Sequence, residues 1–228
     1  MAVGGIAMQS CIIMLRNSMP LLLQGLWITA QLWLVASLIS FIIGLMLGVF
    51  RCNVLRIPYV SVLLDGVTFV LRGIPFYVQL LIVYFVIPNM LGINISAFMA
   101  ALLSLGLCSA SYVSQIIRGG INAIAPGQWE AAKVLGYTTY ETVKYIIFPQ
   151  TIKIVLPALV SELDQLLKST SIVSAIGILE LTGAGRNIIA QEMNPLTIYT
   201  LLAAIYLMMS ALLAIFSVWL EKRLTANH

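Results

Sequence analysis

Long apolar runs separated by short polar stretches dominate the chain. The runs cover residues 21–50, 59–87, 95–117, 151 to about 181, and 196–220. Each is long enough to cross a bilayer, because a transmembrane helix needs about 20 residues. The pattern predicts an all-α integral membrane protein with about five transmembrane helices. Composition agrees, since 61% of the 228 residues are hydrophobic and only 9% are charged.

The two ends of the chain differ from this apolar body. Residues 1–20 hold a weak apolar run with no basic residue before it and Arg16 after it, the wrong order for a secretory signal. We expect an extracytoplasmic or interfacial segment over 1–20, one transmembrane domain over 21–220 and a cytoplasmic tail over 221–228.

The basic residues indicate the orientation, because short cytoplasmic loops are rich in Lys and Arg. Eight of them fall in or beside the loops that would share one side of the membrane: Arg51, Arg56, Arg118, Lys133, Lys144, Lys153, Lys222 and Arg223. Arg16 and Arg186 would lie on the other side. This bias predicts that the N-terminus lies outside, the C-terminus inside and the loop around residue 130 in the cytoplasm.

Several other classes of function are disfavoured. The net charge is +4, but no basic cluster suggests a nucleic-acid partner, and membrane lipid is the expected surroundings. Cys11, Cys52 and Cys108 lack the spacing of a metal or redox site, and the single histidine, His228, is terminal. No nucleophile and base stand together, so direct catalysis is not expected. Gly44 and Gly48 predict a close helix-packing face.

A polar insert, residues 127–149, interrupts the apolar pattern. A short helix is predicted over 128–135, ended by Gly136 in a left-handed conformation. Thr138 and Glu141 have the spacing of a capping box for a second helix, and Pro149 is predicted to end it before the fourth span. From these residues alone, a docking element and an ordinary amphipathic loop are equally acceptable.

The sequence Glu130-Ala131-Ala132, followed by Gly136 and by Ile146-Ile147-Phe148-Pro149, resembles the EAA loop by which permease subunits of bacterial ABC importers seat on their ATPases. Further matches are Arg72-Gly73-Ile74-Pro75 with Gln79 and Tyr84-Phe85, then Ile117–Ile121, Pro126–Ala132, Phe148–Gln150 and Leu167–Ser171. Together they resemble the polar amino acid branch, which handles histidine, glutamine, glutamate, arginine, cystine and opines.

This resemblance implies a type I, MetI-like permease fold with a cytoplasmic coupling loop at about 118–150. Its ATPase-coupling residues would be Glu130, Ala131, Ala132, Gly136 and Pro149. The chain has no glycine-rich nucleotide-binding loop, so a partner ATPase would bind ATP and Mg. Implied partners are that cytoplasmic ATPase, a second permease subunit, identical or not, and an extracytoplasmic amino acid-binding protein.

Charged and polar residues inside the apolar runs are candidates for the substrate path, because each charge at mid-bilayer costs about 2.5–3.5 kcal/mol on insertion scales. The candidates are Arg72, Gln115, Glu162, Asp164, Lys168 and Ser169. Arg72 precedes Gly73 and Pro75, which predict a broken helix, and its guanidinium suits a substrate carboxylate or an ion pair with the fourth span. Asp164 and Lys168 are spaced for a local ion pair, and Glu162 points to another face.

Relatives of this branch commonly carry acids at the positions of Gln115 and Ser169, which favours a neutral polar amino acid over a cationic one here. Two alternatives to an ATP-driven permease stay open. One is an ion-coupled secondary carrier, which would need no docking loop. The other is a scaffold or dimer-partner permease without its own solute site.

Overall fold

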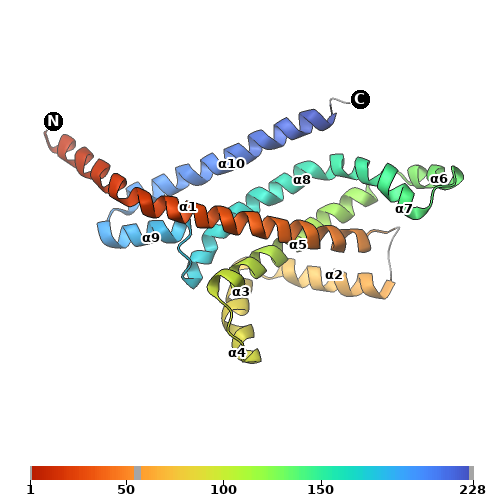
Figure 1. Cartoon of the computed structure of the whole chain (residues 1–228), viewed down its shortest axis with the longest axis horizontal. Coiled ribbons are helices and arrows are strands. Elements are labelled where there is room, and N and C mark those ends of the chain that lie inside the picture. The colour runs from red at the N-terminus through yellow and green to blue at the C-terminus, as the bar shows by residue number, and fades with distance from the viewer. Residues whose placement is uncertain (1, 54–57, 226–228) are drawn as a thin grey trace.

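Helices joined by short turns and loops make up the part described by the computed structural model, which is residues 2–53 and 58–225; for 2–13, 15, 224 and 225 only the backbone is described. Figure 1 shows the helices in order. They are α1 (Ala2–Phe50), α2 (Pro58–Gly73), α3 (Phe76–Leu81), α4 (Ile87–Leu91), α5 (Ala97–Asn122), α6 (Pro126–Val134), α7 (Thr139–Thr142), α8 (Phe148–Ser169), α9 (Leu181–Glu192) and α10 (Pro195–Thr225). Two π-helical turns, η1 (Ile82–Val86) and η2 (Val143–Ile147), and a 3₁₀ segment, η3 (Thr170–Ile176), join some of them.

Five membrane-crossing units match the predicted spans. Within the described residues, four helical stretches are long and apolar enough to cross a bilayer, namely 16–50, 97–122, 139–176 and 195–223. The fifth unit is a bent pair, in which Pro58–Gly73 and Phe76–Leu91 meet at 103°. The prediction of about five spans, one of them broken after Arg72, is confirmed.

The first helix is longer than the sequence pattern predicted. It runs without a break from Ala2 to Phe50 and contains Pro20. Residues 2–20 are therefore not separated from the first span by a turn, and the place of this segment relative to the membrane surface stays a prediction. At the other end α10 continues to Thr225, so the helix extends into the predicted tail.

Helices α1 and α5 lie side by side (Figure 1) and form the most extensive contact in the fold. Glycines on α1 allow the close approach: a Cβ at Gly44 would lie 2.6 Å from Val113, and one at Gly48 would lie 2.7 Å from Ile117. Small residues let membrane helices approach closely where no hydrophobic effect drives them together. The predicted packing face of Gly44 and Gly48 is confirmed.

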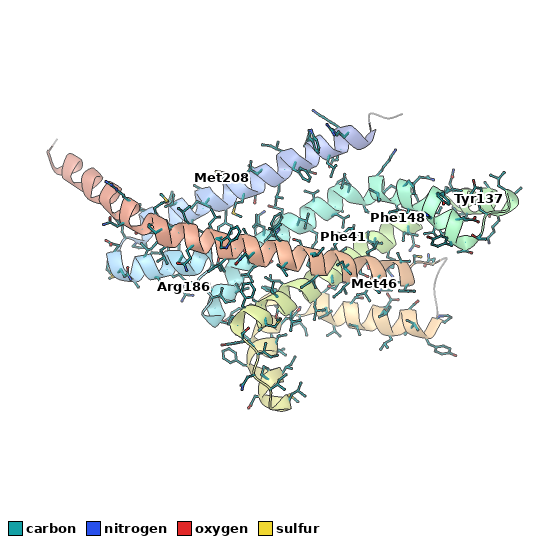
Figure 2. All side chains as sticks on the ribbon, in the orientation of Figure 1. Phe41, Met46, Tyr137, Phe148, Arg186 and Met208 are labelled. Carbon is teal, nitrogen blue, oxygen red and sulfur yellow. The ribbon has the colours of Figure 1, made fainter. Side chains whose placement is uncertain are left out.

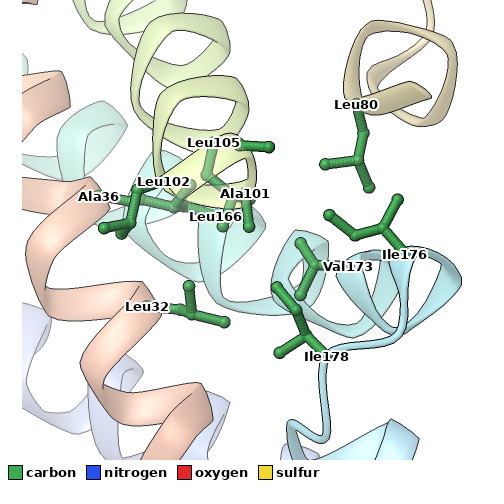
Figure 3. Packing of buried hydrophobic residues seen from close by; sticks show 11 residues of the cluster. Leu32, Ala36, Leu80, Ala101, Leu102, Leu105, Leu166, Val173, Ile176 and Ile178 are labelled. Atoms are coloured by element: carbon green, nitrogen blue, oxygen red, sulfur yellow. The ribbon is translucent and has the colours of Figure 1, made fainter. Parts of the chain in front are cut away.

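A second packing centre joins the broken span to the rest of the bundle. Figure 3 shows Leu80 of α3 facing Ile176, with Val173 next to it, near the end of the span that contains α8. Leu32 of α1 and Leu105 of α5 belong to the same buried cluster. The short helix after the break is thus held by side chains from three other elements.

Helix α9 was not predicted, because Leu181–Glu192 is too polar to resemble a span. It begins at Glu180, whose buried carboxylate accepts hydrogen bonds from the backbone N–H groups of Thr182 (2.9 Å) and Gly183 (2.8 Å). The hydroxyls of Thr29 on α1 and Tyr206 on α10 donate to the same carboxylate. Burial raises the pKa of Glu180, and these donors oppose the shift. Glu180 therefore fixes α9 between α1 and α10.

Charged residues near the C-terminal end of α1 form a partly buried network. The Arg51 side chain is 2% exposed, forms an ion pair with Asp65 of α2 at 2.6 Å and donates to Ser114 of α5 at 2.7 Å. Arg118 lies 3.5 Å from the same carboxylate. Arg51 was interpreted as a loop charge; it instead joins α1, α2 and α5. Arg56 lies outside the described residues.

Candidate functional site

The break in the second span is stabilised by its own polar side chain. A broken helix leaves carbonyl groups without their usual partners, and such groups are costly inside a bilayer. The Gln79 side-chain amide donates to the carbonyl oxygens of Leu71 and Ile74, just before the break. Gln79 is itself 7% exposed. This interaction keeps α2 and α3 at a fixed bend and leaves Arg72 at the end of α2.

A cavity of about 530 Å³ opens at this break, between α2, α3, α5 and α8. Its lining includes Arg72, Gly73, Pro75, Ser109, Tyr112, Glu162 and Ser169. The volume falls within the range of about 300–1,000 Å³ that is usual for small-molecule sites. A broken span that borders a polar cavity is a typical arrangement for solute binding at membrane depth.

Arg72 and Glu162 supply opposite charges to this cavity. The Arg72 guanidinium donates to the Thr68 carbonyl of its own helix at 3.2 Å, and among the described residues it has no ion pair. Glu162 instead accepts a hydrogen bond from Ser109 on α5 at 2.7 Å. The ion pair between Arg72 and the fourth span, one of the two interpretations of this residue, is therefore absent from this conformation. Both charges retain unused hydrogen-bonding capacity.

The other three path candidates lie elsewhere. Asp164 and Lys168 form the expected local ion pair, at 2.5 Å, and Asp164 borders a separate cavity of about 280 Å³ between α8 and α10. Gln115 lies on α5 outside the lining of the larger cavity, and its Oε1 atom is buried without a described partner. Of the six candidates, only Arg72, Glu162 and Ser169 share the cavity.

Helix α5 contributes side chains to the cavity that the sequence pattern did not single out. Cys108, Ser109 and Tyr112 all line the cavity, and Gln165 joins them from α8. Positions 108, 109 and 112 share one face of a helix, so polar spacing within the apolar run 95–117 was the signal available. Cys108, like Cys52, is a free thiol, whereas the side chain of Cys11 is outside the described part.

The predicted insert forms a compact unit at one end of the bundle. Figure 2 places Tyr137 at the tip of this unit and Phe148 near its base, whereas Arg186 lies at the other end of the molecule. Helix α6 ends at Gly136, which has φ +82°. The N–H of Tyr137 donates to Ala132 and that of Gly136 donates to Lys133, as in a Schellman motif. The prediction for Gly136 is confirmed.

The two alanines of the insert have different roles. Ala131 is exposed beside Glu130, but Ala132 is fully buried against the chain itself. The resemblance implied an ATPase-coupling role for both residues. The Ala132 methyl group packs inward within this chain, and its coupling role stays a prediction.

The second half of the insert is continuous with the fourth span. Thr138 and Glu141 form the predicted capping box, with Thr138 N–H donating to Glu141 at 2.8 Å. Pro149 was predicted to end this helix, and that was wrong. The π-turn Val143–Ile147 precedes it, and Pro149 sits in the first turn of α8, where its missing N–H costs little. A helical stretch therefore runs from residue 139 to 176.

Five membrane-crossing units, a polar cavity at a broken span and a helical unit at one end are the features of a solute permease. A family model described as "Binding-protein-dependent transport system inner membrane component" matches residues 40–226. The arginine transport system permease protein ArtQ of Bacillus subtilis (strain 168) is 38% identical over 208 residues, covering 91% of this chain and 94% of that protein. The nopaline transport system permease protein NocM of Agrobacterium fabrum is 32% identical, with 92% of each chain covered.

Solved structures agree with this relationship. The crystal structure of an amino acid ABC transporter with histidines matches with a TM-score of 0.84 and 35% identity, covering 92% of this chain and 96% of that one. The MetNI methionine ABC transporter, at 20% identity and a TM-score of 0.79, shows the same fold.

The chain belongs to the family of binding-protein-dependent transport system inner membrane components. It is accordingly a multi-pass permease component of the inner membrane and not an enzyme, and its transport system includes a separate ATPase and a binding protein. The alternative of an ion-coupled secondary carrier is not supported.

Proposed function

We propose that this chain is the permease subunit of an ATP-driven importer of a polar amino acid, and that the cavity at the broken span is its solute site. The observation that carries the proposal is the presence of Arg72 and Glu162, not paired with each other, in one cavity of about 530 Å³. A free amino acid carries one carboxylate and one ammonium group. The guanidinium binds a carboxylate through two parallel hydrogen bonds, and Glu162 accepts from the ammonium.

Fewer residues of the site bear on the side chain of the substrate than the sequence suggested. Gln115 does not line the cavity, so its lack of charge is no argument about the substrate. Ser169 does line it and still favours a neutral polar side chain over a cationic one. The two relatives named above are permease proteins of an arginine and a nopaline transport system. A polar amino acid is therefore the proposed class, with neutral members preferred.

In this proposal the unit formed by α6, α7 and η2 docks on the ATPase in the cytoplasm, and a binding protein delivers the solute to the opposite face. Support comes from Glu130, Ala131 and Gly136, which are all exposed at one end of the molecule. Pro149 is also exposed, at the base of the unit. The ATPase binds ATP and Mg, and a second permease subunit completes the path. The N-terminus lies outside and the C-terminus inside.

Substitution of Arg72 tests the solute site. The tagged chain is purified with its ATPase and second permease subunit and reconstituted with the binding protein, and uptake of labelled glutamine and arginine is measured. Arg72→Ala should abolish uptake while the ATPase still co-purifies, and Arg72→Lys should restore part of it, because an ammonium binds a carboxylate without the paired geometry. Lys168→Ala is the matched control, since this cation lies outside the cavity.

Undiminished uptake by an assembled Arg72→Ala complex would refute the site and favour a partner subunit without its own solute site. A clear preference of the wild type for arginine over glutamine would overturn the preference for a neutral side chain.

A further inference from the structure

Helix α6 is attached to the membrane bundle through very few side chains. Of its nine residues, Pro126–Val134, only Trp129 and Ala132 are buried. The rest are exposed, among them Val134 at 88%. Because the Ala132 side chain is a single methyl group, Trp129 provides almost all the packing surface between this helix and the spans.

The Trp129 side chain is 8% exposed and belongs to a buried cluster built from several spans. The cluster includes Cys52 after α1, Ile117 and Ile121 of α5, Ile147 of η2 and Val155 of α8. The indole therefore lies where the ends of α1, α5 and the fourth span converge. A small apolar gap of about 30 Å³ borders it. Close-packed interiors transmit displacement because their side chains cannot be compressed.

The fourth span connects this contact with the solute cavity. Its helical stretch runs from residue 139 to 176 and includes Glu162 and Ser169, which line the cavity. The C-terminal end of α6 is joined to this helical stretch by the turn at Gly136, where the chain is exposed. Packing contact between α6 and the spans is therefore made mainly through the indole of Trp129.

We propose that Trp129 is the positioning residue that transmits movement of α6 to the spans, whereas the exposed residues of the same helix serve only the contact with the ATPase. This proposal rests on the proposed function, in which the ATPase displaces α6. Loss of the indole would leave docking intact and weaken the coupling between ATP hydrolysis and uptake.

The test compares Trp129→Ala and Trp129→Phe with the wild type in the full complex, reconstituted with its binding protein. Three quantities are measured: co-purification of the ATPase, ATP hydrolysis, and molecules taken up per ATP hydrolysed. Trp129→Ala should keep the ATPase bound and lower uptake per ATP by about 2- to 30-fold, the range of measured coupling changes. Trp129→Phe should restore most of the loss, because it refills the cluster with an aromatic ring.

Ile188→Ala is the matched control, because Ile188 is 2% exposed in a separate buried cluster of α1, α9 and α10. It removes buried volume far from α6 and should leave uptake per ATP unchanged. If Trp129→Ala does not assemble, Trp129→Leu takes its place and the same ratio is measured on the assembled complex.

Unchanged uptake per ATP in the assembled Trp129 variants overturns the proposal, and so does an equal fall in Ile188→Ala. Failure of the proposed function looks different: the wild type itself would then not bind the ATPase, or its uptake would not need ATP.

Discussion

The crossing of α5 and α8 offers a quantitative test of the packing. A Cβ added at Gly120 would lie 2.1 Å from Cγ1 of Val155 and 3.2 Å from Cγ2 of Thr151. Carbon atoms pack best at about 3.5–4.0 Å, so the first contact is short by about 1.4 Å. Valine in a helix has one strongly preferred χ1 rotamer, so its methyl group cannot easily turn away. The two helices must therefore separate.

For Gly120→Ala we expect a cost of about 1–3 kcal/mol from overpacking, partly offset by about 0.5–1 kcal/mol from the better helix propensity of alanine. A net loss of about 1–2 kcal/mol corresponds to a fall of about 2–8 °C in the midpoint of thermal unfolding for a chain of this size. The measurement is thermal unfolding of the purified chain in detergent.

Two further variants identify the cause. Val155→Ala removes the clashing methyl group and leaves Cβ of residue 155 at 3.6 Å, an ordinary contact. The double variant should therefore be more stable than the sum of the two single changes predicts, by about 0.5–3 kcal/mol. Gly119→Ala is the control, because a Cβ there meets nothing within 4 Å. Additive effects of Gly120→Ala and Val155→Ala, or an equal loss in Gly119→Ala, would refute the packing argument.

Two further predictions concern buried charge, and both are read from thermal unfolding in detergent. Asp65→Asn leaves the Arg51 guanidinium buried without its counter-charge and should cost about 3 kcal/mol of stability. Asp164→Asn breaks a more exposed ion pair and should cost less than about 1 kcal/mol. Equal losses of stability in the two variants would contradict the role of burial. Glu180→Ala removes the N-terminal cap of α9 and leaves buried hydrogen-bond donors without an acceptor, so it should cost at least about 2 kcal/mol of stability. An unchanged midpoint of thermal unfolding would show that packing alone holds α9.

Local features of this protein follow from the sequence because they depend on residues a few positions apart. The break after Arg72 follows from Gly73 and Pro75, and the capping box follows from the three-residue spacing of Thr138 and Glu141. The prediction that Pro149 ends the helix was wrong, because a single π-turn just before it lets the helix continue.

Long-range pairings did not follow from the sequence. The cavity combines Arg72 of α2 with Ser109 of α5 and Glu162 of α8, and nothing local indicates which faces of these helices meet. Asp164, two residues from Glu162, faces α10 instead. The sequence pattern did not single out Glu180, because its hydroxyl donors, Thr29 and Tyr206, are 151 and 26 positions away in the chain.

The sequence by itself determined the membrane class, the number of spans and the place of the polar insert, because apolar length and turn residues act locally. Only the tertiary structure decided which charges share the cavity, which form ion pairs, and that Trp129 packs α6 against the spans. These depend on how each helix is rotated and where it crosses its neighbours, and that is set by packing over the whole bundle.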